Sequence, residues 1–166
     1  MEKLDFLIQY LLDERKEKEI RIPKGEEEKK SLYRALVNIR EPEKISPEFL
    51  KIEDEYLQEV RDQKGIAEID EINTIAHTFE KNCLKSADKI CLWQGDITKL
   101  KIDAIVNAAN SGGLGCFSPN HHCIDNQIHT FAGVRLRLEC SEKVNEIGGK
   151  LKTGEVFITK GYNLPA

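Results

Sequence analysis

An apolar run that ends in a polar, glycine-rich loop is the sequence feature that most constrains this fold. Residues 102–106 are mostly apolar, and residues 107–125 then supply amides, glycines, two thiols, two imidazoles and a carboxylate. A continuous apolar run is typical of a strand that is covered on both faces of a parallel sheet. Polar groups that follow such a strand lie at the carboxyl edge of the sheet, where open α/β folds bind ligands. The sequence therefore predicts an α/β fold with a site in this loop.

Composition places the chain among soluble globular proteins. It has 166 residues, enough for one ordinary domain or one and a half small ones, with 40% hydrophobic and 33% charged residues. No apolar stretch approaches the length of a membrane span, and residues 1–5 include acids and begin no signal-peptide core. The net charge is −4, and no basic patch is interleaved with aromatic residues. We expect neither a membrane nor a nucleic acid as partner.

The cysteine count indicates the redox compartment. Five cysteines, an odd number, occur without a secretory signal, which favours reduced thiols in a cytoplasmic protein over a disulfide framework. Cys83, Cys91 and Cys140 stand alone in the sequence and are interpreted as small core residues.

The two halves of the chain differ in their periodicity. Helical spacing of apolar residues predicts helices over 4–12 and 26–39, and Ser46-Pro47 predicts the start of a third that continues to residue 60. A further helix is expected around 68–84. From residue 90 the pattern predicts strands over 90–94, 103–106 and 155–159 and one long helix over 124–147. We therefore expect a helical extension over 1–88 and an α/β unit over 89–166.

Two thiols and an imidazole in one short loop form the sharpest candidate site. Cys116, His121 and Cys123 carry the ligand types that Zn²⁺ prefers, and three protein ligands leave a fourth position for water or substrate. The spacing matches no standard zinc-finger pattern, so a loop with two buried thiols and a surface histidine is the alternative. His122 competes with His121 as the imidazole ligand.

Asp125, Asn107 and Asn110 are the next candidates. Asp125 falls at the start of the predicted long helix, where it can cap the helix or serve as a base beside a bound water or sugar hydroxyl. The two asparagines follow the apolar run, and they suit either a turn or hydrogen bonds to a ribose.

Backbone and turn groups complete the set of candidates. The glycines at 112, 113 and Gly115 can bring main-chain amides close to a phosphate, although the dinucleotide-binding spacing is absent. Asp96 follows the predicted strand 90–94 and can either close a turn or accept a hydrogen bond from an exocyclic amine. His77 and His129 lie in predicted helices and receive no functional assignment.

With these residues in hand, the chain resembles the zinc-dependent macrodomains, a bacterial and fungal branch of the ADP-ribose-binding macrodomains. The matching segments are residues 92–98, 103–110, 115–117, 124–126, 128–133 and 161–165, together with Pro119, His121 and Cys123, and the helical segment around 46–57. The resemblance implies a three-layer α/β/α macrodomain preceded by a helical extension. Members of this family continue beyond the segment that corresponds to Pro165, so it also implies that the chain is truncated to the N-terminal portion of the domain.

The resemblance also implies an activity and roles for the candidate residues. The activity is zinc-dependent hydrolysis that removes ADP-ribose from mono-ADP-ribosylated protein side chains. Cys116, His121 and Cys123 would hold Zn²⁺, and Asp125 would assist hydrolysis with Asn110. Substrate contacts would come from the residues Asp96, Ile97, Asn107, Asn110 and Gly115. A lipoyl-carrier protein as the ADP-ribosylated substrate and a sirtuin-like ADP-ribosyltransferase are the implied partners.

Other functions stay open on the sequence alone. A non-catalytic ADP-ribose-binding module or an inactive truncated remnant would bind ligand without turnover or not bind it at all. A structural zinc module that recruits proteins through its acidic helices would bind no nucleotide.

Overall fold

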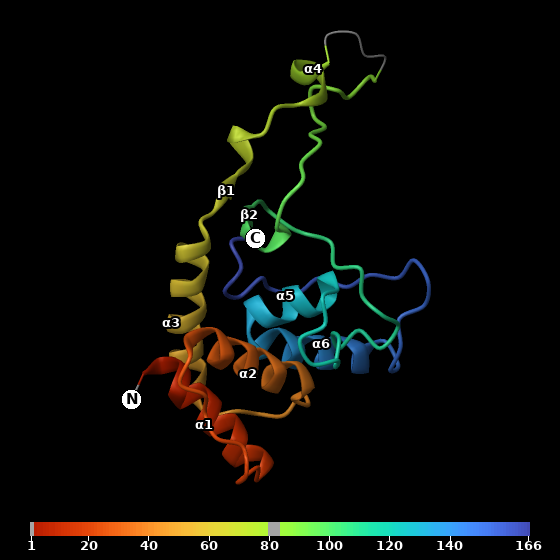
Figure 1. Cartoon of the computed structure of the whole chain (residues 1–166). Helices are drawn as coiled ribbons and strands as arrows, with labels where there is room; N and C mark the ends of the chain where they lie inside the picture. The colour runs from red at the N-terminus through yellow and green to blue at the C-terminus, as the bar shows by residue number, and fades with distance from the viewer. Residues whose placement is uncertain (1, 80–83) are drawn as a thin grey trace.

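The computed structural model describes residues 2–79 and 84–166. The elements, in chain order, are α1 (Lys3–Arg15), α2 (Glu26–Ile39), α3 (Pro47–Lys64), β1 (Ala67–Glu68), the 3₁₀ turn η1 (Ile69–Glu71), α4 (Ile75–Thr78), the 3₁₀ turn η2 (Ile97–Lys99), β2 (Leu100–Lys101), α5 (Ile124–Ala132) and α6 (Val134–Glu146). The fold is mixed α/β, with a helical N-terminal region and a small parallel sheet (Figure 1).

Three helices form the N-terminal region, as the sequence predicts. The Ser46 hydroxyl accepts a hydrogen bond from the Phe49 N–H at 3.1 Å, which caps α3 just before its first residue, Pro47. Phe49 is fully buried in a core that the three helices share with α6. The residues of this core are Leu4, Leu7, Ile8, Leu11, Leu12, Tyr33, Leu36, Val37, Phe49, Tyr56, Leu57 and Val134. The helical region is thus joined to the C-terminal half by a continuous apolar contact.

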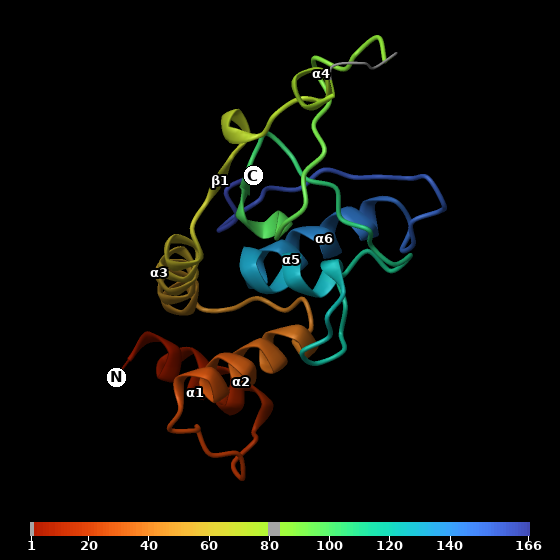
Figure 2. The same cartoon turned by 45° about the horizontal axis from the view of Figure 1, so that its top comes forward.

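The single long helix expected over 124–147 is wrong, because α5 and α6 are separate helices that meet at Gly133. Gly133 has a φ of +93°, and a Cβ there would lie 2.8 Å from the Glu53 carboxylate. Glu53 comes from α3 and accepts a hydrogen bond from the Val134 N–H at 3.0 Å. The break is therefore stabilised by a residue far away in the sequence. Figure 2 shows α5 and α6 side by side, to the right of α3 and above α1 and α2.

The strands expected over 90–94, 103–106 and 155–159 are not formed in the described part of the chain. There, β1 pairs in parallel with β2, Ala67 opposite Leu100, and a lone antiparallel bridge joins Thr74 to Cys91. Val106, Val156 and Ile158 are 84%, 85% and 87% exposed. A strand needs a neighbour to pair its backbone N–H and C=O groups. Among the described residues, segment 90–94 has only the bridge to Thr74, and segments 103–106 and 155–159 form no β-pairing.

The connection between α3 and η2 also differs from its prediction. Instead of a helix over 68–84, the chain contains β1, η1 and the short helix α4, and these segments extend away from the helices (Figures 1 and 2). Residues 80–83 of that predicted helix, and with them the core assignment of Cys83, lie outside the described residues. Cys140 is buried, as predicted, whereas Cys91 is only half-buried.

None of the described helices combines the length and the apolar character needed to cross a bilayer.

Candidate functional site: a thiol and imidazole cluster beside a buried carboxylate

The loop before α5 gathers Cys116, His121 and Cys123. Their ligand atoms all lie within 4.8 Å of one another, and the Cys116 Sγ is 3.7 Å from the His121 Nδ1. Cys123 is the N-cap of α5, where its sulfur accepts a hydrogen bond from the Asn126 N–H at 3.4 Å. The competing His122 lies instead on the wall of a groove of about 550 Å³ between α2, α3 and α5.

The donor set suits zinc, and the Cys116–His121 pair has the spacing of two ligands of a tetrahedral ion. With zinc–sulfur bonds near 2.3 Å and zinc–nitrogen bonds near 2.0 Å, two ligands of a tetrahedron stand roughly 3.5–3.8 Å apart. The Cys116–His121 separation of 3.7 Å agrees with that edge length. Both thiols are half-buried and His121 is exposed, so the cluster is open to solvent on the imidazole side. A fourth ligand from solvent or substrate has access to such a site.

The two thiols differ in acidity. Burial raises the pKa of Cys116, but hydrogen bonds from the Ser118 main chain and from Cys123 outweigh this effect, so the net pKa is lowered. Burial raises the pKa of Cys123, and the Cys116 sulfur raises it further. Cys116 is therefore the thiol that deprotonates first, and thiolates are the metal-binding form.

Asp125 joins the two candidate asparagines in one hydrogen-bonded group. The Asn107 Nδ2 donates to the Asp125 Oδ1 at 2.7 Å, and the Asn110 Nδ2 approaches the other oxygen at 3.5 Å and donates to the Gly115 carbonyl at 3.2 Å. Asp125 is 4% exposed. Burial raises its pKa, and the hydrogen bond from Asn107 opposes that shift. The helix-cap interpretation of Asp125 is wrong, because Cys123 occupies that position.

His129 belongs to this group, although its sequence context predicted no functional role for it. It lies one helical turn after Asp125, and its Nε2 is 3.6 Å from the Asp125 Oδ1. Burial, with the charge of Arg137 as a second cause, lowers the pKa of His129 to about 3, so the imidazole is neutral. The i, i+4 spacing on a helix was the signal that could have found it.

Gly115 is required by this packing. Its φ is +85°, and a Cβ there would lie 2.7 Å from the His129 ring. A side chain at this position would displace the imidazole from Asp125, so glycine is needed here both for its backbone conformation and for space.

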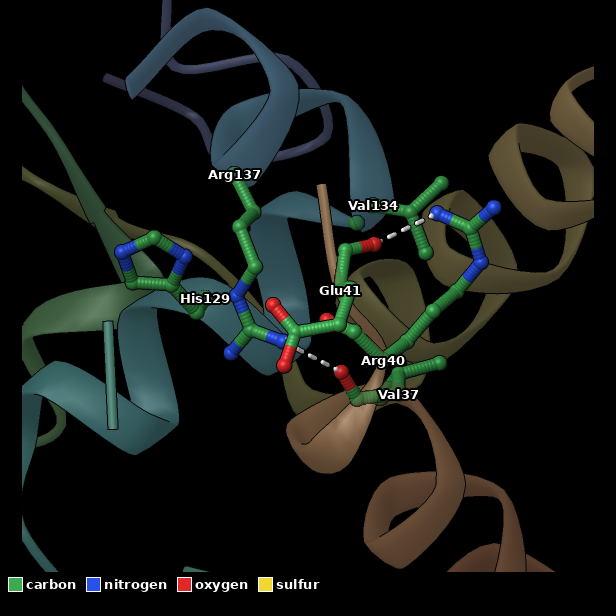
Figure 3. A pocket seen from close by; sticks show the side chains of 7 residues that line it. Val37, Arg40, Glu41, His129, Val134 and Arg137 are labelled. Carbon is green, nitrogen blue, oxygen red and sulfur yellow. Dashed lines mark hydrogen bonds between the residues drawn. The ribbon is translucent and has the colours of Figure 1, made fainter. Parts of the chain in front are cut away.

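Arg137 links this group to the end of α2 (Figure 3). Its Nη1 donates to the carbonyls of Val37, Asn38 and Arg40 at 2.9, 2.9 and 2.6 Å, and its Nε donates to the Leu114 carbonyl at 2.8 Å. The side chain is buried beside His129 at a small cavity of about 10 Å³. The glycine loop is thus tied to the helical region by one guanidinium.

Asp96 and Ile97 lie apart from this group, at η2. Asp96 caps that turn by accepting a hydrogen bond from the Thr98 N–H at 3.0 Å, and it pairs with the Lys64 ammonium at 2.7 Å. Burial raises the pKa of Asp96, but hydrogen bonds from Lys64 and Thr98 outweigh this and leave it lowered. No hydrogen bond between described residues joins Asp96 to Asp125 or to the asparagines.

Comparison with known proteins places part of the chain in a family. Residues 106–166, which contain the cluster and the carboxylate, match the Macro domain family.

Curated proteins that are similar to the chain carry hydrolase names. The chain is 46% identical to a protein named protein-ADP-ribose hydrolase from Treponema medium, over 99% of this chain and 60% of that protein. It is 42% identical to a protein of the same name from Staphylococcus aureus (strain MRSA252), over 99% of this chain and 58% of that protein. A Fusarium oxysporum f. sp. cubense protein named probable bifunctional ADP-ribose hydrolase/ADP-ribosyltransferase is 43% identical over 81% of this chain and 22% of its own length. The chain thus spans about three fifths of the length of the first two relatives.

Proposed function

We propose that this protein is a zinc-dependent hydrolase that removes ADP-ribose from mono-ADP-ribosylated protein side chains. The observation that carries the proposal is the adjacency of two chemically distinct groups. A ligand set of two thiols and an imidazole ends at Cys123, and two residues later Asp125 stands buried between two amides. The names of the relatives supply the substrate class.

Asp125 is the general base in this proposal. Its raised pKa makes it a stronger proton acceptor than an exposed carboxylate, and the hydrogen bond from Asn107 fixes its orientation. Water attacks the anomeric carbon of the protein-linked ribose and loses its proton to Asp125. The bond between that carbon and the side chain breaks, and the leaving side chain takes up a proton from solvent. His129 cannot supply that proton, because it is neutral near pH 7.

Cys116, His121 and Cys123 would hold the zinc ion. When bound, zinc supplies Lewis-acid polarisation of a water or a ribose hydroxyl. Asn110 would position the distal ribose, and the position of its Nδ2 between Asp125 and the Gly115 carbonyl supports this role.

The phosphates and the adenosine of ADP-ribose would extend away from the distal ribose. The main chain around Gly115 is proposed for the phosphates, and Asp96 with the Ile97 main chain for adenine. Lys64 and Thr98 already bind the Asp96 carboxylate, but a carboxylate has about four acceptor positions and can take one more hydrogen bond.

The partners follow from the same proposal. The substrate would be an ADP-ribosylated protein, with a lipoyl-carrier protein as the candidate, and a sirtuin-like ADP-ribosyltransferase would add the group. The Fusarium relative, named for both a hydrolase and a transferase activity, supports such a pairing.

Metal analysis and turnover test the proposal together. The purified protein is expected to contain close to one zinc per chain and to release ADP-ribose from a mono-ADP-ribosylated protein. A chelator and Cys116→Ala are expected to abolish both, whereas Cys91→Ser, which alters a half-buried thiol outside the cluster, is expected to change neither. Turnover that survives complete chelation would remove zinc from the mechanism.

A non-catalytic ADP-ribose reader is the second candidate. Asp96 pairs with Lys64, and no hydrogen bond between described residues joins it to Asp125, which supports an adenine-binding region that is independent of the catalytic group. Calorimetry with ADP-ribose separates the two functions, because binding without turnover of any modified protein would favour the reader.

A further inference from the structure

The helical N-terminal region touches the cysteine and histidine loop directly, through α2. The Arg34 guanidinium donates from Nε and Nη2 to the Asn126 Oδ1 at 3.1 and 2.8 Å. The same Nη2 donates to the main-chain carbonyl of His121 at 2.6 Å. One side chain of α2 therefore binds both the loop and the start of α5.

Asn126 in turn forms hydrogen bonds to other parts of the loop. It is fully buried, and its Nδ2 donates to the Ser118 carbonyl at 3.0 Å. Its main-chain N–H donates to the Cys123 sulfur at 3.4 Å. Arg34 thus fixes an amide that holds the loop on one side and a ligand thiol on the other.

Asn38, one helical turn after Arg34, makes a second contact. Its Oδ1 accepts a hydrogen bond from the Asn120 N–H at 3.0 Å, and its Nδ2 donates to Thr130 at 3.0 Å. Asn120 has a φ of +55°, a conformation that needs support from its surroundings. The two residues lie on one face of α2, so a single helix face holds the main chain on both sides of His121.

These contacts concern the geometry of the ligands and not only the stability of the fold. Groups that hydrogen-bond to metal ligands and their main chain orient them, and their loss commonly lowers metal affinity about 10- to 100-fold. A guanidinium also places a positive charge beside the loop, where the Cys116 and Cys123 sulfurs would carry negative charge when they bind a metal. Its planar fork binds two acceptors at once, which an ammonium cannot reproduce.

We propose that Arg34 is a positioning residue that sets the zinc affinity of the Cys116, His121 and Cys123 loop, so that the helical region tunes the metal site. This inference rests on the zinc site of the proposed function. It adds a residue of the helical region, 87 positions away from His121 in the sequence, to the control of that site.

Zinc affinity, measured by competition with a chromophoric chelator, tests the inference without any enzyme assay. Arg34→Met is expected to bind zinc about 10- to 100-fold more weakly than the unaltered protein. Arg34→Lys is expected to recover part of this loss, because one of the two acceptors is still reached. Lys30→Met is the matched control, since Lys30 lies one turn earlier on α2 and, among the described residues, forms its ion pairs with Glu26 and Glu27 at the surface.

The absorption spectrum of the cobalt-loaded protein distinguishes ligand geometry from general destabilisation. The bands are expected to shift in Arg34→Met and to stay unchanged in Lys30→Met. If Arg34→Met does not fold, Arg34→Gln, which keeps a donor, takes its place in both measurements. Equal zinc affinity and equal spectra in the Arg34 variants and the unaltered protein would overturn the inference alone. Failure of the unaltered protein to bind zinc would instead overturn the metal site of the proposed function.

Discussion

Replacement of Glu53 by glutamine should remove a large pH dependence from the stability of this protein. Glu53 is fully buried where α3 meets the start of α6, and it binds the Tyr33 hydroxyl at 2.8 Å and the Val134 N–H at 3.0 Å. Burial raises its pKa to about 7 from an ordinary 4.5, and the two hydrogen bonds only partly oppose this. The ionised form is therefore costly in the folded state.

The sign of this pH dependence follows from the number of protons that the folded and unfolded states bind. Between pH 4.5 and 7 the folded protein keeps a proton on Glu53 that the unfolded chain has lost, so the free energy of unfolding falls as pH rises. The difference between pKa values of about 7 and 4.5, at about 1.36 kcal/mol per pKa unit, gives a limit of about 3.4 kcal/mol. About 2.5 kcal/mol of this falls between pH 5 and pH 8. Above pH 8 the contribution is constant.

Urea unfolding followed by circular dichroism measures the effect. His129 acts in the opposite direction, because its lowered pKa of about 3 makes stability rise with pH up to about 6.5. The comparison therefore uses the difference between Glu53→Gln and the unaltered protein at each pH. We expect the variant to gain about 2.5 kcal/mol relative to the unaltered protein from pH 5 to pH 8. Glu48→Gln, at an exposed position of the same helix, is the control, and equal pH slopes in the Glu53 variant and the unaltered protein would refute the reasoning.

Three further predictions concern the site. Asp125→Asn should lower turnover about 10²- to 10⁴-fold in a steady-state release assay while ADP-ribose binding persists, because only the proton acceptor is lost; unchanged turnover would exclude Asp125 as the base. Arg137→Met should lower the free energy of unfolding by about 3–5 kcal/mol in urea titration, since four carbonyls lose a buried donor. Gly115→Ala should be more destabilising than Gly148→Ala in thermal melts. Both glycines have a positive φ, but only at Gly115 does the new Cβ meet a ring; equal losses would contradict the close packing of His129.

The helices could be predicted from the sequence because their signals are local. The bounds of α2 match the prediction at both ends, and the cap and proline at the start of α3 lie where Ser46-Pro47 indicates. The strands could not be predicted in the same way. Val106 and Ile158 have strong β-propensity, but a strand forms only with a partner, and pairing is a property of distant segments.

The same distinction between local and distant signals applies to the candidate site. Cys116, His121 and Cys123 could be grouped from their spacing, because one short loop contains them all. Asp125 and Asn107 come together through the reversal of the chain between the apolar run and α5, which the predicted α/β order already implied. What each group binds stays a prediction until zinc and ADP-ribose are measured.

The residues that escaped prediction share a physical property: they satisfy buried polar groups across long sequence separations. Arg34 and Asn126 are 92 positions apart, and Glu53 and Val134 are 81 apart. In the sequence, Arg34 is one more cation on an amphipathic helix, and Glu53 one more acid on another. The role of each residue becomes clear only when the position of its partner is known. A buried charge without its hydrogen bonds would be strongly destabilising, so each partner must lie at the right place in the fold. Such pairs allow one docking of the N-terminal helices against α5 and α6, and that docking brings α2 against the loop that carries the candidate zinc ligands.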